Sequence, residues 1–191
     1  RTLGMVRREH GTATPVLWSR SVERMSLIER VALRGEVHLT VVRGDITPAD
    51  EARILADEID DELWQRIVSR EVVHNLITNI GRANTATILA TGTTRPLYIG
   101  VGNTAITPAV TDTSLSGEID RNAISTSVQF QTYYARFAAT FTAADFNDTV
   151  RGVSLNTSSS GGDIWALVSA NTVKDGSSAL VADWRLQITT L

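Results

Sequence analysis

The sequence predicts an α+β protein in which an extended N-terminal arm and a short mixed region precede a C-terminal antiparallel β-sandwich of jelly-roll type. Charged side chains concentrate in residues 1–74, whereas Thr, Ser, Asn and Gly dominate residues 75–191. Helical spacing of apolar residues is confined to residues 47–90. About six or seven short alternating segments, separated by turn residues, fill roughly the last 100 residues, as in sandwiches and jelly rolls.

The composition excludes several classes of protein. The chain has 191 residues, a net charge of −3 and no cysteine, so disulfide scaffolds and thiolate metal sites are excluded. No basic stripe indicates nucleic-acid binding, and no run of about 18 apolar residues predicts a membrane-spanning helix. We therefore expect neither nucleic acid nor membrane among the partners.

Residues 1–25 show no sustained periodicity, which predicts an extended arm. Gly4, Gly11 and Pro15 interrupt this segment, and Val16 and Trp18 are apolar without an evident local partner. An arm of this kind becomes ordered only against another surface, so we expect it to pack on a neighbouring subunit.

Residues 26–91 are expected to form a mixed α/β region. Residues 26–43 alternate as two strand-like runs, with a bend or turn at Gly35 between them. A helix begins after Thr47, a good N-cap followed by Pro48, and its apolar spacing continues to Leu63. Residues 64–73 alternate again as a strand, and residues 75–90 return to helical spacing, including Leu76, Ile77, Ile80 and Ala83.

Residues 92–191 are expected to form the sandwich domain. Gly100 and Gly102 leave one face of a strand bare, which suits close approach of another backbone. Further strands are predicted at 124–130, 133–141, 153–155 and 164–169, with a turn at Asp175-Gly176. The last strand alternates most clearly. It is expected to direct Leu180, Ala182, Trp184, Leu186 and Ile188 inward, and Asp183, Arg185, Gln187 and Thr189 outward.

Few residues suggest chemistry, and we expect no catalytic residue, no cofactor and no metal site. The acidic cluster of residues 57–62 resembles a solvated helix end more than a cation site, which needs converging oxygens. His10, His38 and His74 are scattered, with His38 expected to face solvent and His74 expected to cap or pair at a strand–helix junction. No metalloprotease, nucleophile-elbow or phosphate-loop pattern occurs.

Several segments, taken in order, resemble a group of tailed-phage virion proteins. The first is His74–Arg82 (HNLITNIGR), which resembles the opening of that group. The segments that follow are Leu97–Ala105 (LYIGVGNTA), Pro108–Leu115 (PAVTDTSL), Glu118-Ile119, Tyr134–Phe137 or Ala138–Phe141, Arg151–Asn156, Gly161–Ala166 and Leu180–Ile188. Two features depart from the pattern: Val153-Ser154-Leu155 replaces a Gly-Leu-Phe run, and Thr47–Leu63 is an insertion.

The resemblance implies a β-sandwich virion component of the tail, neck, turret or capsid-decoration type. It implies a non-enzymatic structural subunit, located in the virion, that forms a symmetric homo-oligomer. The implied partners are other virion proteins, namely capsid, portal or neck, and tail subunits.

The sequence is also compatible with two other functions. A carbohydrate-binding module for host attachment would use exposed aromatic rings, for which Trp165, Tyr98, Tyr133 and Tyr134 are candidates, and a host surface glycan would then be a partner. A hydrolase would need converging carboxylates, for which Asp145 and Asp148 are candidates, although both lie in a polar turn.

The arm leads to a first prediction. Deleting residues 1–25 should weaken assembly of the subunit and leave the isolated sandwich folded, because the arm packs on a neighbouring chain. Sedimentation velocity reports assembly, and circular dichroism with thermal unfolding reports the fold. A deletion variant that assembles like the full chain would exclude this role for the arm.

Overall fold

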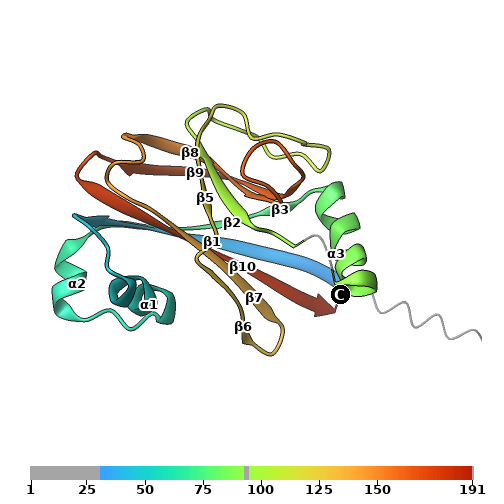
Figure 1. The fold of residues 1–191 in the computed structure, drawn as a ribbon, viewed down its shortest axis with the longest axis horizontal. Helices are drawn as coiled ribbons and strands as arrows, with labels where there is room; N and C mark the ends of the chain where they lie inside the picture. Colours follow the sequence, from blue (N-terminus) through green and yellow to red (C-terminus); the bar gives the residue numbers. More distant parts are fainter. Residues whose placement is uncertain (1–30, 93–94, 191) are drawn as a thin grey trace, which may run out of the picture.

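A computed structural model describes residues 31–92 and 95–190 (Figure 1). The predicted arm of residues 1–25, and the part of the first predicted strand before residue 31, lie outside these ranges. The elements are β1 (Val31–Arg43), α1 (Pro48–Ala56), α2 (Asp61–Arg66), β2 (Ile67–His74), β3 (Leu76–Ile77), α3 (Asn79–Thr91), β4 (Tyr98–Gly102), β5 (Glu118–Ala123), β6 (Thr126–Gln131), β7 (Tyr134–Phe141), β8 (Asp148–Asn156), β9 (Ile164–Lys174) and β10 (Ser178–Thr190).

The strands form two antiparallel sheets of five strands each, which confirms the predicted β-sandwich. Sheet A has the order β2-β1-β10-β7-β6, and sheet B has the order β3-β9-β8-β4-β5. The sandwich was expected only for residues 92–191. The structure extends it to β1, β2 and β3, because these strands pair with β10 and β9.

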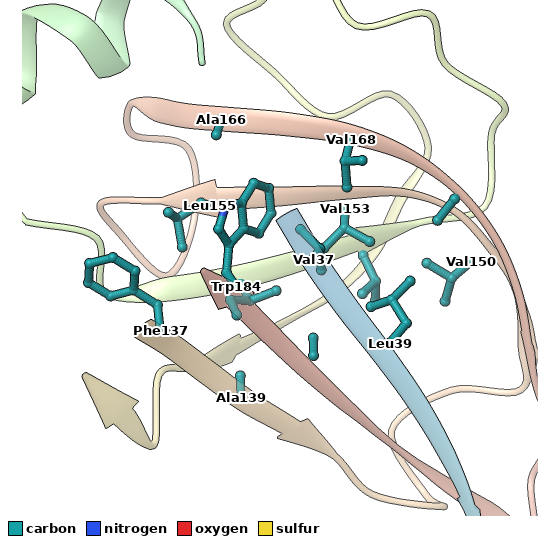
Figure 2. Close-up of a cluster of buried hydrophobic side chains, with 14 of the residues drawn as sticks. Val37, Leu39, Phe137, Ala139, Val150, Val153, Leu155, Ala166, Val168 and Trp184 are labelled. Carbon is teal, nitrogen blue, oxygen red and sulfur yellow. The ribbon is translucent and has the colours of Figure 1, made fainter. Parts of the chain in front are cut away.

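The main core lies between the two sheets. Alternation along β1 and β10 directs Val37, Leu39 and Trp184 inward, and each of these side chains is fully buried. Figure 2 shows them facing Val153 and Leu155 of sheet B. Burying a tryptophan side chain contributes roughly 3 kcal/mol, so Trp184 is a principal anchor of the sandwich.

The helices α1 and α2 cover part of the outer face of sheet A, where Ile54, Leu55 and Leu63 pack on Val42 and Val181. The predicted start of α1 is confirmed. The Thr47 side chain accepts a hydrogen bond from the Asp50 N–H, and the Asp50 carboxylate accepts one from the Thr47 N–H.

The structure has two helices, α1 and α2, where a single helix was expected over residues 47–63. The first ends at Ala56, where Asp57 adopts a left-handed conformation with φ of 61°. Asp60 then caps α2 by accepting from the Leu63 N–H at 2.9 Å. The predicted strand at 64–73 therefore begins only at Ile67, since Trp64 belongs to α2.

The helix expected over residues 75–90 begins later than predicted. Leu76 and Ile77 form the short strand β3, which pairs with β9, and Thr78 caps α3. Gly81 has a packing role within this helix. A Cβ atom there would lie 2.0 Å from the carbonyl oxygen of Trp165, so only glycine lets α3 approach β9 this closely.

Three expectations for the long strands are corrected. Gly35 makes no turn, because β1 continues through it in register with Leu186 of β10. Asp183 points to the outer face of sheet A as predicted, but it is buried there rather than solvated. Its carboxylate pairs with Arg136 at 3.0 Å and with Arg185 at 2.8 Å. Ile188, expected inward, is 50% exposed near the end of β10.

The outer face of sheet B is covered by the long connection between β4 and β5. Ile106 and Leu115 from this connection pack on Ile164 and Leu167 of β9. The strand β5 that follows, Glu118–Ala123, was not predicted, because its polar sequence has no apolar alternation. The structure nevertheless pairs it with β4.

Asp50 gives a prediction about acid stability. The Thr47 N–H, together with the Thr47 hydroxyl and Arg66, holds the pKa of Asp50 below its ordinary value of 3.8 despite partial burial. A depressed pKa in the folded state stabilises the protein above pH 3.8, and this stabilisation is lost as the pH falls through that range. Asp50→Asn should lower the free energy of unfolding by about 1 kcal/mol at pH 7.

Urea unfolding at several pH values measures this effect. The difference between Asp50→Asn and the wild type should shrink as the pH falls below the ordinary pKa. Asp61→Asn is the matched control, since Asp61 is an exposed first-turn carboxylate whose side chain has no hydrogen-bond partner among the described residues. Equal losses of unfolding free energy in the two variants would contradict the stabilising role of the Asp50 carboxylate. A loss in Asp50→Asn that does not change with pH would contradict it too.

Candidate functional site

A cavity with a volume of about 520 Å³ lies beside the first half of β1. We call it the basic pocket. Its lining comes from β1, the β2–β3 connection, α3, β7 and β10, and consists of residues 33–36, residues 74–77, Arg82, Tyr134, Arg185 and Gln187.

The pocket exists because β1 extends beyond its neighbour β2. The pairing of β1 with β2 stops at Glu36, whereas its pairing with β10 continues to Val31. After His74 the chain leaves sheet A and crosses to sheet B through Asn75. The Asn75 N–H still donates to the Gly35 carbonyl oxygen at 3.0 Å, so the open edge of β1 comprises residues 31–34. At Gly35 a Cβ atom would lie 2.4 Å from the Asn75 side-chain oxygen, so glycine is needed for the crossing.

Positive charge predominates in the pocket. Arg34 and Arg82 are exposed, and neither guanidinium group forms a hydrogen bond or ion pair with any described residue. The single carboxylate of the lining, Glu36, hydrogen-bonds His38 at 2.8 Å. Uncommitted guanidinium groups match the planar geometry of carboxylates and phosphates, so the pocket suits an acidic ligand.

Asn75 is a second unusual feature of the pocket. Both polar atoms of its side-chain amide are buried without a hydrogen-bond partner in the described structure. Such a group costs about 1–3 kcal/mol. The crossing is held by the main-chain bond from the Asn75 N–H to the Gly35 carbonyl oxygen and by the surrounding sandwich, not by the Asn75 side-chain amide.

The three histidines of the chain were expected to be scattered. His10 lies outside the described residues. His38 was expected to face solvent, but its side chain is only 17% exposed because it lies beside Glu36 on the outer face of sheet A. His74 lies at the end of β2, as its junction position predicted, and it is exposed in the lining of the basic pocket.

The acidic cluster of residues 57–62 connects α1 to α2. Asp57 pairs with Arg70 at 2.9 Å, and Asp60 pairs with Arg53 at 2.6 Å. Within the described ranges, no three His, Cys, Asp or Glu residues come close enough to hold a metal ion together. Part of the cluster thus serves as helix caps and ion pairs.

The carboxylates considered for hydrolysis are occupied by turn hydrogen bonds. Asp145 accepts from the Thr142 N–H at 2.6 Å and from Asn122 at 3.1 Å. Asp148 accepts from Asn103 at 2.8 Å, and this bond lowers its pKa below the ordinary value. A hydrolytic acid needs the opposite shift, so Asp148 is unsuited to that role.

Lys174 lies near these carboxylates and closes the same turn. Its side chain is fully buried, and its ammonium donates to the carbonyl oxygens of Ala143 and Phe146. The same ammonium lies 4.5 Å from the centre of the Phe146 ring. Burial lowers the pKa of Lys174 below its ordinary value, and the nearby Asp145 partly opposes this shift.

The aromatic residues considered for glycan stacking do not act together. Trp165 is 4% exposed and belongs to the core between the sheets. Tyr98 lies on β4 of sheet B, whereas Tyr133 and Tyr134 lie in the β6–β7 hairpin region of sheet A. Tyr133 is 65% exposed, which makes it the most accessible ring of the four.

No family model, no curated protein and no solved structure matches the chain. No helix in the described ranges is long and apolar enough to cross a membrane.

Sequence reasoning did not find the basic pocket. Arg34 and Arg82 are 48 positions apart, and Asn75 falls within a segment that was predicted to be helical. Only the end of β2 and the crossing to β3 bring these residues together. A weak signal was Gly35 inside an alternating run, since an internal strand glycine often marks close approach of another segment.

The structural role of Lys174 gives a chemical prediction. The chain contains a single lysine, so an amine-reactive ester should label its ε-amine slowly in the native protein and rapidly in urea. Mass spectrometry of the peptide containing Lys174 measures the extent of labelling. In the control variant Val173→Lys, a lysine at the neighbouring position, which is 62% exposed in the wild type, should react quickly in the native protein. Equal native labelling of both lysines would contradict the burial of Lys174.

Proposed function

We propose that this chain is a non-enzymatic structural subunit of a tailed-phage virion or phage-like particle, where it assembles as a symmetric oligomer on the capsid, neck or tail. The proposal is supported by the ordered series of segments from His74 to Ile188 that resembles virion proteins. The β-sandwich framework is compatible with it, because such sandwiches serve as building blocks of many capsid and attachment proteins.

The observation that carries an assembling role is an uncovered apolar edge of sheet A. Trp64 of α2 is 59% exposed, and Val68 and Val72 of the edge strand β2 are 52% and 53% exposed. Edge strands of monomeric proteins are usually protected by charges or by covering segments. Exposed apolar side chains along such an edge favour a surface that another subunit covers.

We also infer a jelly-roll arrangement within the sandwich. The first and last strands, β1 and β10, are neighbours inside sheet A, and the chain passes between the sheets after β2, β5, β7 and β9. Repeated crossing of this kind is typical of Greek-key and jelly-roll sandwiches. The inference concerns the winding of the chain alone.

Direct analysis of particles tests the proposed role. Particles purified by density gradient from a lysate whose phage encodes this chain should contain it in many copies, as measured by quantitative mass spectrometry. An antibody against the sandwich should label one defined position on the particle in negative stain. A replication protein of the same phage serves as the control for carry-over. Abundance of this chain in the lysate together with its absence from the particles would exclude the virion role.

A further inference from the structure

We propose that the basic pocket of one copy binds the acidic α1–α2 connection of a second copy. This contact deepens the proposed function, since it rests on self-assembly of the subunit, and it assigns a partner to a cavity that has none within its own chain. We call residues 57–62 the acidic connector.

The acidic connector presents carboxylates that the chain itself does not neutralise. Asp57 and Asp60 are paired with Arg70 and Arg53. The other three carboxylates, those of Glu58, Asp61 and Glu62, are exposed and have no ion pair or side-chain hydrogen bond with described residues. Three unpaired negative charges within five positions repel one another, and this repulsion is relieved when a cationic surface approaches.

The basic pocket presents the complementary charges. Arg34 projects from β1 and Arg82 from α3, and both guanidinium groups are without partners in the described structure. The open edge of β1 lies beside them, since residues 31–34 pair only with β10. Main-chain groups at this edge can donate hydrogen bonds to a docked loop and accept hydrogen bonds from it. These bonds would add to the ion pairs that the two arginines form.

The two surfaces cannot meet within one molecule. Arg34 lies near one end of β1, whereas Arg43 at the other end leads into α1. Nine residues of extended strand span roughly 30 Å, at about 3.3 Å per residue. Figure 1 shows α1 and α2 at one end of the molecule and α3 at the other. The contact must therefore form between copies.

Other occupants fit the pocket less well. Residues 1–30 contain six arginines and three glutamates, so the N-terminal segment is itself basic and would be repelled. A nucleic-acid backbone is bound by many basic side chains along its length, whereas this lining offers two uncommitted arginines. The acidic connector has the matching charge and is present at the same concentration as the pocket. Complementary charges of this kind mainly direct the choice and orientation of partners.

Charge reversal on each surface tests the contact. The pocket variant Arg34→Glu/Arg82→Glu and the connector variant Glu58→Arg/Glu62→Arg are prepared as full-length chains, and sedimentation velocity measures self-association. Each variant alone should associate roughly tenfold more weakly than the wild type, because like charges then face each other. An equimolar mixture of the two should associate again, because each reversed pocket meets a reversed connector. Association of the wild type should weaken with added salt.

Arg151→Glu is the matched control, since Arg151 is an exposed arginine on β8, in the other sheet. This control variant should associate like the wild type. Circular dichroism establishes that every variant is folded, and the recovery in the mixture also excludes misfolding as the cause of a loss. The inference is overturned by a wild type that stays monomeric, by reversed variants that associate normally, or by a mixture that does not recover.

Particle composition separates this inference from the proposed function. If the chain is found in purified particles but charge reversal leaves self-association unchanged, the virion role stands and the self-contact is wrong. Loss of the pocket variant from particles, with normal self-association, would also overturn the self-contact, because the pocket would then bind another virion protein. If the chain is absent from particles but shows the reversal and recovery, the contact stands and the virion role fails.

Discussion

The structure depends on the pairing of its first and last described strands. β1 and β10 form an uninterrupted antiparallel ladder from Val31–Thr190 to Arg43–Ser178, in the interior of sheet A. Inward residues of both strands, including Val37 and Trp184, form the side of the core that faces sheet B. Because the two strands are far apart in the sequence, sheet A cannot form until the chain up to β10 is present. The same ladder separates the basic pocket from the acidic connector.

The two outer faces of the sandwich are covered in different ways. Apolar side chains of α1 and α2 cover one end of sheet A, and the buried charges of Asp183, Arg136 and Arg185 occupy the same face nearby. At the edge, Glu71 of β2 accepts hydrogen bonds from the Asn171 N–H and from the Thr172 hydroxyl of β9, which ties the two sheets together. Sheet B is covered by α3 and by the β4–β5 connection. These coverings leave the edge at β2 and the pocket at β1 accessible.

The accessible features suit association with other molecules. The carboxylates and the lysine near the β7–β8 turn are engaged in closing that turn. The two described histidines, His38 and His74, lie on the neighbouring strands β1 and β2, and His38 hydrogen-bonds Glu36. The uncommitted groups are instead an apolar edge around Trp64, an acidic connector and a basic pocket. Surfaces that combine apolar area with complementary charge are those that proteins use to select and orient partners. The proposed self-contact uses two of these surfaces, the acidic connector and the basic pocket.

Local patterns in the sequence determined the sandwich, the start of α1 at Thr47 and the inward face of β10 as far as Leu186, because alternation and capping act between residues a few positions apart. Tertiary structure decided what depends on distant neighbours. Leu76 and Ile77 had helical spacing, but pairing with β9 made them a strand. Asp183 sits at an outward position, yet Arg136 and Arg185 bury and neutralise it. The basic pocket arises where β2 ends before β1 does, and strand lengths of this kind are set by sheet pairing rather than by any local signal.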